Sequence, residues 1–509
     1  MGSDKSAVAS LQGEAQGRAR CRPINRDQLF FRSVDVEKLV EADHPVRAIW
    51  ELVGHLDLEP FYAQVEAVEG VAGRPVWDPQ LLISLWIYAY QEGLSSAREI
   101  SRLCEYHPGY QWLTAMEVVN YHTLADFRVQ HKEVLDGIFI GVLGVLSYQG
   151  LITLDRVMQD GSKVKANASD KSFRRKATLE KHLELARKQV EQMGDPLSEE
   201  LTERVVRARQ RALREKQERL KLALKELEKI EACRGKSAEK KEARASTTDP
   251  EARVMLQAKG AYGPAYNVQI STDAGAKIIV GVGVSQSAND AGELEPGVER
   301  VEANLGQKPK QMVVDEGYTN SGSLEAMAER EIDLLGSAPE ARKATWDPWQ
   351  RRGLSREFYP EAFQYDSGAD RYTCPAGQVL TYETREQHGC WWHYRYRARA
   401  SDCQSCAFQA QCCPGTKKGR SVVRREQTAE WKAFRAKMET VEAKEIYKQR
   451  SEVAEFPNAW IKDKIGLRQF RLRGLAKVTL ETMWACLTYN VSQWIRLCWK
   501  PQRLAQALS

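Results

Sequence analysis

The stretch MQDGSKVKANAS, residues 158–169, sets one carboxylate among cations and small polar residues. The apolar run GLITL precedes it and is typical of a β-strand. Asp160 is followed by Gly161, a common turn dipeptide, so a turn residue is one interpretation. The other is a metal ligand that ends the strand, with Lys163 and Lys165 alternating onto one face toward a phosphate backbone. Partner carboxylates elsewhere in the chain have to decide between these interpretations.

Two later acidic residues are candidates for such partners. Asp315 ends a short apolar strand pattern, Met312–Val314, and Glu455 lies on a charged helical pattern. In-line cleavage of a phosphodiester can use two Mg²⁺ ions about 3.5–4 Å apart, and Mg²⁺ prefers carboxylate oxygens and water. Each acid alone reads as a turn or surface residue, whereas their joint occurrence on three separate elements indicates a metal site.

The order of elements between these acids predicts the fold. Two strand patterns flank DAGA and indicate a β-hairpin over 264–285, and a helix follows over about 290–305. We interpret Asp273 as a hairpin-turn residue and Asp290 as the N-cap of that helix. Strand, hairpin, helix, strand and acid-bearing helix is the order of an RNase H-like fold, an α/β class with a mixed sheet and flanking helices. Its first and fourth strands lie side by side, so acids at these positions can converge.

On these blocks the sequence resembles bacterial insertion-sequence transposases of the DDE type, in the IS-four/IS-five clan and most closely the IS-eleven-eighty-two branch. DGSKVKANAS is similar to that branch's first-Asp block, AKGAYGPAYNVQISTD to its central block and VVDEGYTN to its second-Asp block. The third block, YKQRSEVAEFPNAWIK, resembles a signature on one helix that is carried here by Tyr447, Arg450, Glu455 and Lys462. The resemblance runs over residues 31–498, nearly the whole chain.

The spacing in the third block departs from the family pattern at one point. Six residues separate Glu455 from Lys462, as the family expects, but four separate Arg450 from Glu455, where the broader clan has three. Glu452 is therefore the competing candidate for the third acid. Phe456 also stands where relatives often carry the proline that follows the glutamate. The spacing to the lysine favours Glu455.

The resemblance implies a DNA transposase that binds terminal inverted repeats and catalyses end cleavage and strand transfer. Asp160, Asp315 and Glu455 would hold Mg²⁺ or Mn²⁺ ions that activate water, and the freed 3′-OH would then attack target DNA. Its partners would be double-stranded DNA, at transposon ends and targets, and a second copy of the chain in a dimer on paired ends. The alternatives are a metal-dependent nuclease without strand transfer and an inactive, transposase-derived DNA-binding protein. The expected DNA contacts are Tyr447, Arg450, Lys462, Lys163, Lys165, Trp391 and Trp392.

Changes in composition along the chain predict five regions, one of which is made of three separate segments. We expect a flexible N-terminus, an all-α DNA-binding domain, a catalytic core in three pieces, a charged helical hairpin or coiled coil, and a Cys-rich β insertion. The hairpin reads equally well as a solvated insertion without chemistry. The respective ranges are 1–29, 30–148, 149–171 with 246–340 and 427–509 for the core, 172–245 for the hairpin and 341–426 for the β insertion.

The clearest helical signals lie in the predicted DNA-binding domain. Asp78 reads as an N-cap with Pro79 at the first helical position, and Gly93 ends the helix. Ser96 and Glu99 have the spacing of a capping box for a second helix. Two helices joined by a short turn fit a helix-turn-helix, and they fit an ordinary helical hairpin equally well.

Six of the eleven cysteines fall within 40 residues of the predicted β insertion. Cys403 and Cys406 form a C-x-x-C pair that, with Cys374 and Cys412, suits a tetrahedral structural Zn²⁺ site. The other reading is a set of reduced, buried thiols. Trp391 and Trp392 lie in the same insertion and could stack on an unpaired base, although a small β-sheet core is slightly favoured. The alternative zinc ligands are Cys413, Cys390, His388 and His393.

The overall composition is that of a soluble globular protein. Hydrophobic residues make up 42% and charged residues 28% of 509 residues, and the net charge is +6, so affinity for nucleic acid has to come from local clusters. The longest apolar run, over 137–148, is shorter than the roughly 20 residues of a membrane-spanning helix. No secretory signal is evident either. We therefore expect a cytoplasmic, nucleoid-associated bacterial protein that does not bind membranes.

Overall fold

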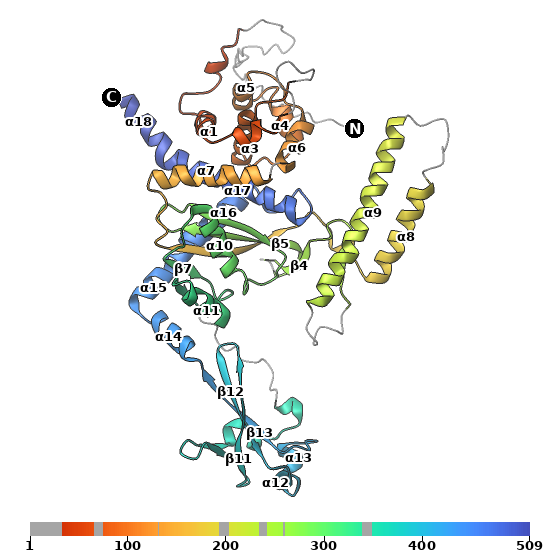
Figure 1. Cartoon of the computed structure of the whole chain (residues 1–509), viewed down its shortest axis with the longest axis vertical. Helices are drawn as coiled ribbons and strands as arrows, with labels where there is room; N and C mark the ends of the chain where they lie inside the picture. The colour runs from red at the N-terminus through yellow and green to blue at the C-terminus, as the bar shows by residue number, and fades with distance from the viewer. Residues whose placement is uncertain are drawn as a thin grey trace, which may run out of the picture.

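The computed structural model describes residues 33–65, 75–130, 132–192, 203–233, 242–257, 260–337 and 349–508. The predicted flexible segment 1–29 and the helix break at 194–196 lie outside these ranges. The described residues form a mixed α/β structure in which a central sheet has helices above it, a helical hairpin at one side and a β-rich unit below, as Figure 1 shows. No helix among them is long and apolar enough to cross a membrane.

The central sheet consists of β1 (Val157–Lys165), β4 (Arg253–Leu256), β5 (Tyr262–Asp273), β6 (Ile279–Ser285), β7 (Gln311–Val314) and β8 (Asp333–Gly336). Its strand order is β4-β5-β1-β7-β8. The strand β6 pairs with the same edge of β5 as β4 does, but further along β5. The predicted hairpin over 264–285 is confirmed as the antiparallel pair β5–β6. β1 lies antiparallel to β5 and parallel to β7, so the two aspartate-bearing segments are neighbours, as predicted.

The structure corrects the prediction for the beginning of this sheet. The GLITL run is not a strand: residues 151–156 have no regular structure, and Leu154 has a positive φ of 55°. β1 begins at Val157 and continues through Asp160 and Gly161, which pair with Ile270 and Gln269 of β5. The Asp-Gly dipeptide is therefore neither a turn nor the end of the strand. The long partner strand β5 supplies a ladder along all of β1, and this outweighs the local turn preference.

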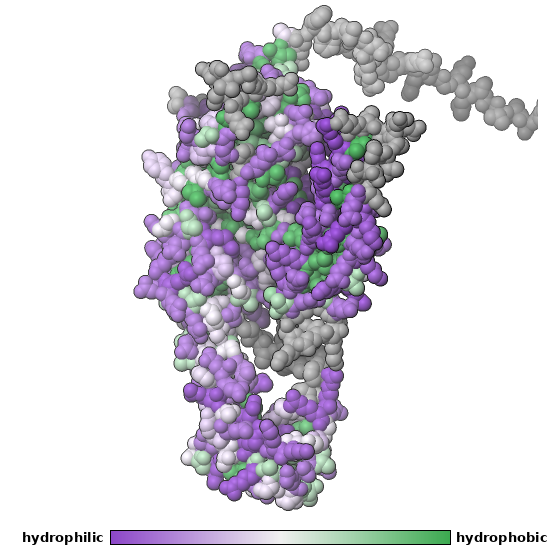
Figure 2. Space-filling model, turned by 45° about the vertical axis from the view of Figure 1, so that its right-hand side comes forward, coloured by the Kyte–Doolittle hydropathy of each residue, from purple (hydrophilic) through white to green (hydrophobic). Residues whose placement is uncertain are grey.

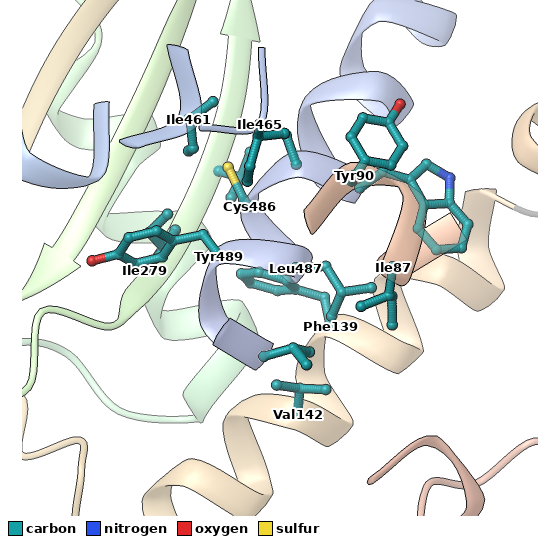
Figure 3. Close-up of a cluster of buried hydrophobic side chains, with 14 of the residues drawn as sticks. Ile87, Tyr90, Phe139, Val142, Ile279, Ile461, Ile465, Cys486, Leu487 and Tyr489 are labelled. Carbon is teal, nitrogen blue, oxygen red and sulfur yellow. The ribbon is translucent and has the colours of Figure 1, made fainter. Parts of the chain in front are cut away.

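The N-terminal helices pack onto the sheet through one long apolar helix, α17 (Leu475–Trp494). The N-terminal elements are η1 (Val36–Lys38), α1 (Pro45–Gly54), α2 (Glu59–Tyr62), α3 (Pro79–Gln91), α4 (Ala97–Leu103), α5 (Pro108–Thr114), α6 (Tyr121–Gln130) and α7 (Lys132–Tyr148). Figure 3 shows α17 between these helices and β6, with Leu487 beside Ile87 and Phe139, and Tyr489 beside Ile279. One hydrophobic cluster therefore extends from the helices into the sheet.

The predicted capping signals are present in these helices. The Asp78 carboxylate accepts a hydrogen bond from the Gln80 amide at 2.7 Å, and Pro79 is the first residue of α3. The Ser96 hydroxyl accepts from the Glu99 amide at 3.5 Å, while the Glu99 carboxylate pairs with Arg102 and not with the backbone of Ser96. The second half of the predicted capping box is therefore replaced by a surface ion pair.

The charged stretch forms a hairpin of α8 (Lys176–Gln192) and α9 (Glu203–Ala232), preceded by η2 (Asp170–Ser172) and by β2 (Phe173–Arg174), which pairs with β3 (Ala245–Ser246). Leucines and alanines of the two helices make a separate small core. Glu226 of α9 is 1% exposed and pairs with Arg253 of β4, which ties the hairpin to the sheet. Figure 2 turns this side of the molecule forward and shows its mainly hydrophilic surface.

The Cys-rich region forms its own antiparallel five-stranded sheet, shown at the bottom of Figure 1. Its strands are β9 (Gln364–Asp366), β10 (Arg371–Thr373), β11 (Val379–His388), β12 (Trp391–Ala398) and β13 (Ser421–Gln427). Its short helices are η4 (Gln350–Arg352), η5 (Arg356–Phe358), η6 (Pro360–Ala362), α12 (Ala400–Gln404) and α13 (Gln409–Cys412). Cys390, at the turn before β12, packs against the main hydrophobic cluster and connects the tip of this unit to the body.

The remaining elements complete the layers around the central sheet. α10 (Leu294–Leu305) and α11 (Ser321–Glu329) follow β6 and β7, respectively. After β13 come α14 (Ala429–Met438), α15 (Val441–Lys448), the π-helical segment η7 (Ser451–Glu455), α16 (Phe456–Asp463), α17, the π-helical segment η8 (Ile495–Trp499) and α18 (Lys500–Leu508). The predicted core segment 427–509 thus consists of several helices, and Gln427 itself ends β13.

Candidate active site

The parallel pairing of β1 and β7 sets the first two predicted acids level with each other. Val157 pairs with Met312, and Met158 pairs with Val313. Continuing this register by two residues aligns Asp160 with Asp315, which follows directly after β7. Because side chains alternate along a strand, Asp160 shares a face with Met158. The sheet thereby brings together two carboxylates that are far apart in sequence.

The third acid reaches this face on η7. Val453 and Ala454 of η7 are buried in a cluster with Met158 and Val313, which fixes the segment against the sheet. Arg450 precedes the π-helical turn and Glu455 ends it, and an Arg450 nitrogen lies 3.5 Å from a Glu455 oxygen. One π-helical turn accommodates one extra residue in a helix, and such turns are frequent at functional sites. The turn thus accounts for the additional residue between the arginine and the glutamate.

Arg450 and Asn458 both contact Asp160. An Arg450 nitrogen lies 3.6 Å from one carboxylate oxygen, and the Asn458 amide donates to the other at 3.2 Å. Burial raises the pKa of Asp160 to about 6; the positive charge of Arg450 opposes this rise, and the negative charges of Asp315 and Glu455 add to it. Asp315 and Glu455 therefore lie near enough to act electrostatically on Asp160, and Arg450 lies between Asp160 and Glu455. Sequence reasoning missed Asn458, which lies one helical turn after Glu455.

Glu452, the competing third acid, points elsewhere. Its carboxylate pairs with Lys277 at 2.6 Å, and its side chain is 72% exposed. Among the causes that shift the pKa of Asp160, the charge of Glu455 appears and that of Glu452 does not. The geometry therefore favours Glu455.

Asp290 is a second residue that sequence reasoning misplaced. The N-cap position of α10 is Glu293 and not Asp290. The Asp290 carboxylate accepts from the Lys163 ammonium at 3.0 Å, from Asn267 at 2.6 Å and from Gln269 at 2.7 Å. It lies so close to β1 that a Cβ at Gly161 would be 2.5 Å from its oxygen. The signal in the sequence was the alternation of Asn267 and Gln269 inside an apolar strand.

The predicted DNA-contacting residues near the central sheet differ in their exposure and in how close they lie to the acids. Lys462 donates to the Ser162 hydroxyl, and burial lowers its pKa, so it lies beside the acids. Lys163 is 18% exposed and engaged by Asp290, whereas Lys165 is exposed at the end of β1. Tyr447 lies in α15, which ends at Lys448, so the four signature residues are not on one uninterrupted α-helix as predicted. It packs against the cluster beneath η7.

Trp391 and Trp392 stand apart from the acids, at the start of β12. Both are half-buried, and the Arg385 guanidinium lies 4.3 Å from the Trp392 ring centroid. This cation–π contact within the small sheet fits the structural reading at least as well as a base-stacking role.

The donor chemistry of the acidic site fits hard divalent cations, because carboxylate oxygens are the ligands that Mg²⁺ and Mn²⁺ prefer. Across the described ranges, however, no three His, Cys, Asp or Glu side chains are close enough to hold a metal ion. The Arg450 guanidinium lies between Asp160 and Glu455 and offsets part of their negative charge.

The predicted zinc ligands gather in one place. Cys374, Cys403, Cys406 and Cys412 line a cavity of about 20 Å³, together with Cys413. Cys390 and His393 are not among its lining residues. Burial raises the pKa of Cys412 to about 12, and the Cys403 sulfur accepts a hydrogen bond from the Arg420 amide at 3.3 Å. Cys403, Cys412 and Cys413 are buried and Cys374 and Cys406 are half-buried, and among the described residues they do not form a group close enough to hold a metal ion.

Replacing Asp160 by asparagine should stabilise the metal-free protein at neutral pH. A carboxyl whose pKa rises from 3.8 to about 6 on folding contributes stability at low pH, which is lost as the pH rises through 6. The loss is at most about 3 kcal/mol, at 1.36 kcal/mol per pKa unit, and the variant avoids it. Urea unfolding in EDTA at about pH 7.5 measures the gain, which should vanish near pH 4. A gain of equal size at both pH values would show that the ionisation of Asp160 is not its cause.

Two parts of this chain match family models of transposases. Residues 34–130 match the family model described as a transposase domain (DUF772), and residues 373–495 match the one described as a transposase DDE domain. Both matches are to transposases. Together they support an insertion-sequence transposase of the DDE type, and the second includes Glu455 but neither aspartate.

No curated protein matches the chain. A cryo-EM structure of a piggyBac transposase synaptic complex with hairpin DNA covers 91% of this chain and 81% of that chain at 9% identity. Its TM-score of 0.22 is too low to carry an argument.

Proposed function

We propose that the chain is a DNA transposase that cuts the ends of an insertion sequence and joins them to target DNA. The observation that carries the proposal is that Asp315, directly after β7, and Glu455, at the end of η7, lie near enough to Asp160 of β1 for their charges to raise its pKa. The two transposase-family matches supply the class of reaction. The strand order β5-β1-β7-β8, with β6 beside β5, supports an RNase H-like core. We retain the IS-four/IS-five clan and the IS-eleven-eighty-two branch as part of the proposal.

Each residue of the site has a role in this mechanism. The three acids would hold divalent cations, which when bound supply a nucleophilic water and stabilise charge on the reacting phosphate. Asn458 orients the Asp160 carboxylate through its amide. Arg450 is close enough to Asp160 and Glu455 to move from the acids to a phosphate oxygen when cations neutralise the site. Lys462 presents a second cation at the Ser162 end of β1.

End recognition is proposed for the N-terminal helices. Residues 81–90 of α3 are all buried, so α3 cannot enter a DNA groove without unfolding. α4 has an exposed side with Arg98 and Arg102, next to the turn after α3. This is the arrangement in which the second helix of a helix-turn-helix reads the major groove. Binding by a dimer on paired ends and location at the nucleoid follow from the same proposal.

The experiment is incubation of the protein with its own flanking DNA, Mg²⁺ and a supercoiled target plasmid. The proposal expects cuts at the terminal inverted repeats and covalent joining of the ends to the plasmid. Cuts without joined products would indicate the nuclease instead. Specific binding without cuts would indicate an inactive DNA-binding descendant.

The cysteine cavity supports a separate proposal of a structural Zn²⁺ site. A cavity of about 20 Å³ has room for about one water-sized particle, and four thiolates suit tetrahedral zinc. We expect about one zinc per chain by elemental analysis, lost in Cys403→Ser/Cys406→Ser. The matched control is Cys233→Ser, because Cys233 is exposed on the hairpin. Equal zinc in both variants, or none in the parent, would leave the thiols as ordinary core residues.

A further inference from the structure

The hairpin helix α9 forms one wall of a large groove with the central unit. The opposite wall is made by residues 248–251 and 473–477, and the groove encloses about 820 Å³. The α9 residues that face it recur at helical spacing from 207 to 222 and therefore form one face of the helix. No step of the proposed mechanism uses this groove.

The groove is lined by an excess of basic side chains. They are Arg207, Arg211, Arg214, Arg219, Arg473 and Lys477. The N-terminal half of α9, residues 203–217, has six basic residues (Arg204, Arg207, Arg209, Arg211, Arg214 and Lys216) and two acidic residues, Glu203 and Glu215. Neither Arg211 nor Arg214 forms an ion pair with any residue that the structure describes.

Most of the acidic residues in the groove are engaged by other groups. Asp249 accepts from the Tyr266 hydroxyl at 2.8 Å and from the Gly474 amide at 3.1 Å. Glu251 accepts from the Leu475 amide at 2.9 Å. Glu218 pairs with Lys221 at 2.8 Å. Six basic and four acidic side chains line the groove, so it has a net positive charge, and its Asp249 and Glu251 carboxylates are held by donors of its own wall.

The walls of the groove are held in a fixed relation. Glu226, about one turn beyond the groove along α9, pairs with Arg253 of β4 and with Lys229 at 2.6 Å. Gln286 donates to the Glu251 carbonyl at 2.6 Å and to Glu226 at 3.4 Å, bridging the two walls. Separating the hairpin from the sheet would leave the buried Glu226 carboxylate without its Arg253 partner. Because an unpaired buried charge is strongly destabilising, this ion pair resists the separation.

The groove lies near the C-terminal end of β1, the strand that carries Asp160. Arg473, in its wall, donates to the Asn167 carbonyl at 3.1 Å. Asn167 follows β1, seven residues after Asp160, so the groove begins about 20 Å from the acids at roughly 3.3 Å per strand residue. That distance equals about six base pairs of duplex at 3.4 Å each.

We infer that this groove binds the phosphodiester backbone of duplex DNA flanking the cut. The inference rests on the proposed function and assigns a role to the hairpin that the sequence left open. Unpaired arginines on one helix face contact phosphates without reading bases, so they contribute affinity and position rather than sequence preference. An acidic protein segment would suit the same charge, and the experiment below separates the two.

The test compares Arg211→Ala/Arg214→Ala with Arg209→Ala/Lys216→Ala, which removes the same charge from the opposite face of α9. The long duplex extends about ten base pairs beyond the cut on both sides, and the short duplex about three, so only the long one spans the distance to the groove. We expect the groove variant to bind the long duplex about tenfold more weakly, with the slope of log affinity against log salt reduced by about 1.8, at 0.9 per lost contact. Binding and Mg²⁺-dependent cleavage of the short duplex should equal the parent's, and the control variant should match the parent on both duplexes.

Each outcome decides one of the two proposals. If both variants bind the long duplex like the parent, the groove inference is overturned while the cleavage proposal stands, and an acidic segment becomes the better ligand. If the parent cuts neither duplex, the proposed function fails. An Arg211→Lys/Arg214→Lys variant that restores long-duplex binding would establish charge, and not packing, as the cause. Continued weak binding by this variant would count against a backbone contact.

Discussion

Replacing Glu455 by glutamine is expected to lower Mg²⁺-dependent cleavage of transposon-end DNA by about 10³-fold while leaving end binding unchanged. Glutamine keeps the shape but removes a charged cation ligand, and metal stabilisation of the reacting phosphate contributes several kcal/mol. A loss of about 4 kcal/mol corresponds to that factor at 1.36 kcal/mol per tenfold. Cleavage of labelled end DNA under single-turnover conditions measures the rate, and gel mobility measures binding.

Glu452→Gln is the matched control, three residues away on the same π-helical segment. Its carboxylate pairs with Lys277 and is exposed, so cleavage should stay within about twofold of the parent. Asp160→Ala and Asp315→Ala should behave like Glu455→Gln. Retained cleavage in Glu455→Gln together with lost cleavage in Glu452→Gln would reverse the assignment of the third acid.

Replacing Trp484 by alanine is expected to lower the free energy of unfolding by about 3–5 kcal/mol. Trp484 is 2% exposed in α17, its ring centroid lies 6.5 Å from that of Trp86, and its indole donates to the Arg128 carbonyl at 3.3 Å. Removing it opens a cavity between α17 and the N-terminal helices and leaves that carbonyl without its partner. Urea unfolding followed by circular dichroism measures the loss.

Tyr148→Ala provides the comparison, because Tyr148 is 93% exposed at the end of α7. Its effect should lie within about 0.5 kcal/mol. A small effect for Trp484→Ala would mean that the N-terminal helices contribute little to the stability of the sheet, against the continuous cluster described above.

Part of the central sheet could be predicted from the sequence. The hairpin over 264–285 follows from two strand patterns that flank a turn, and the pairing of the Asp160 and Asp315 segments follows from the RNase H-like order of elements; both are present. The error at GLITL arose because a short apolar run has no unique secondary structure. Because β1 pairs with β5, the strand begins at Val157 and continues through Gly161.

The remaining site residues depend on contacts between distant segments, which local patterns do not encode. Asn458 reaches Asp160 across 298 residues, and Asp290 reaches Lys163 across 127. The only sequence signal for the π-helical turn was the irregular spacing between Arg450 and Glu455. That spacing did not predict the type of helical turn. Asn167 of the first block is a further example of a contact between distant segments, because its amide donates to the Arg471 carbonyl at 2.6 Å.

The two-sided packing of α17 has a consequence for how such proteins diversify. One face of this helix contacts the N-terminal helices through Trp484, while Asn490 on another bonds both backbone groups of Ile279 at the edge of β6. Exchanging residues 34–130 for those of a relative would therefore not be a modular graft, since the incoming helices would meet a surface shaped for others. Under the end recognition proposed above, new specificities should arise by point changes at exposed positions such as Arg98 and Arg102, or by co-inheritance of α17 with its helical partners.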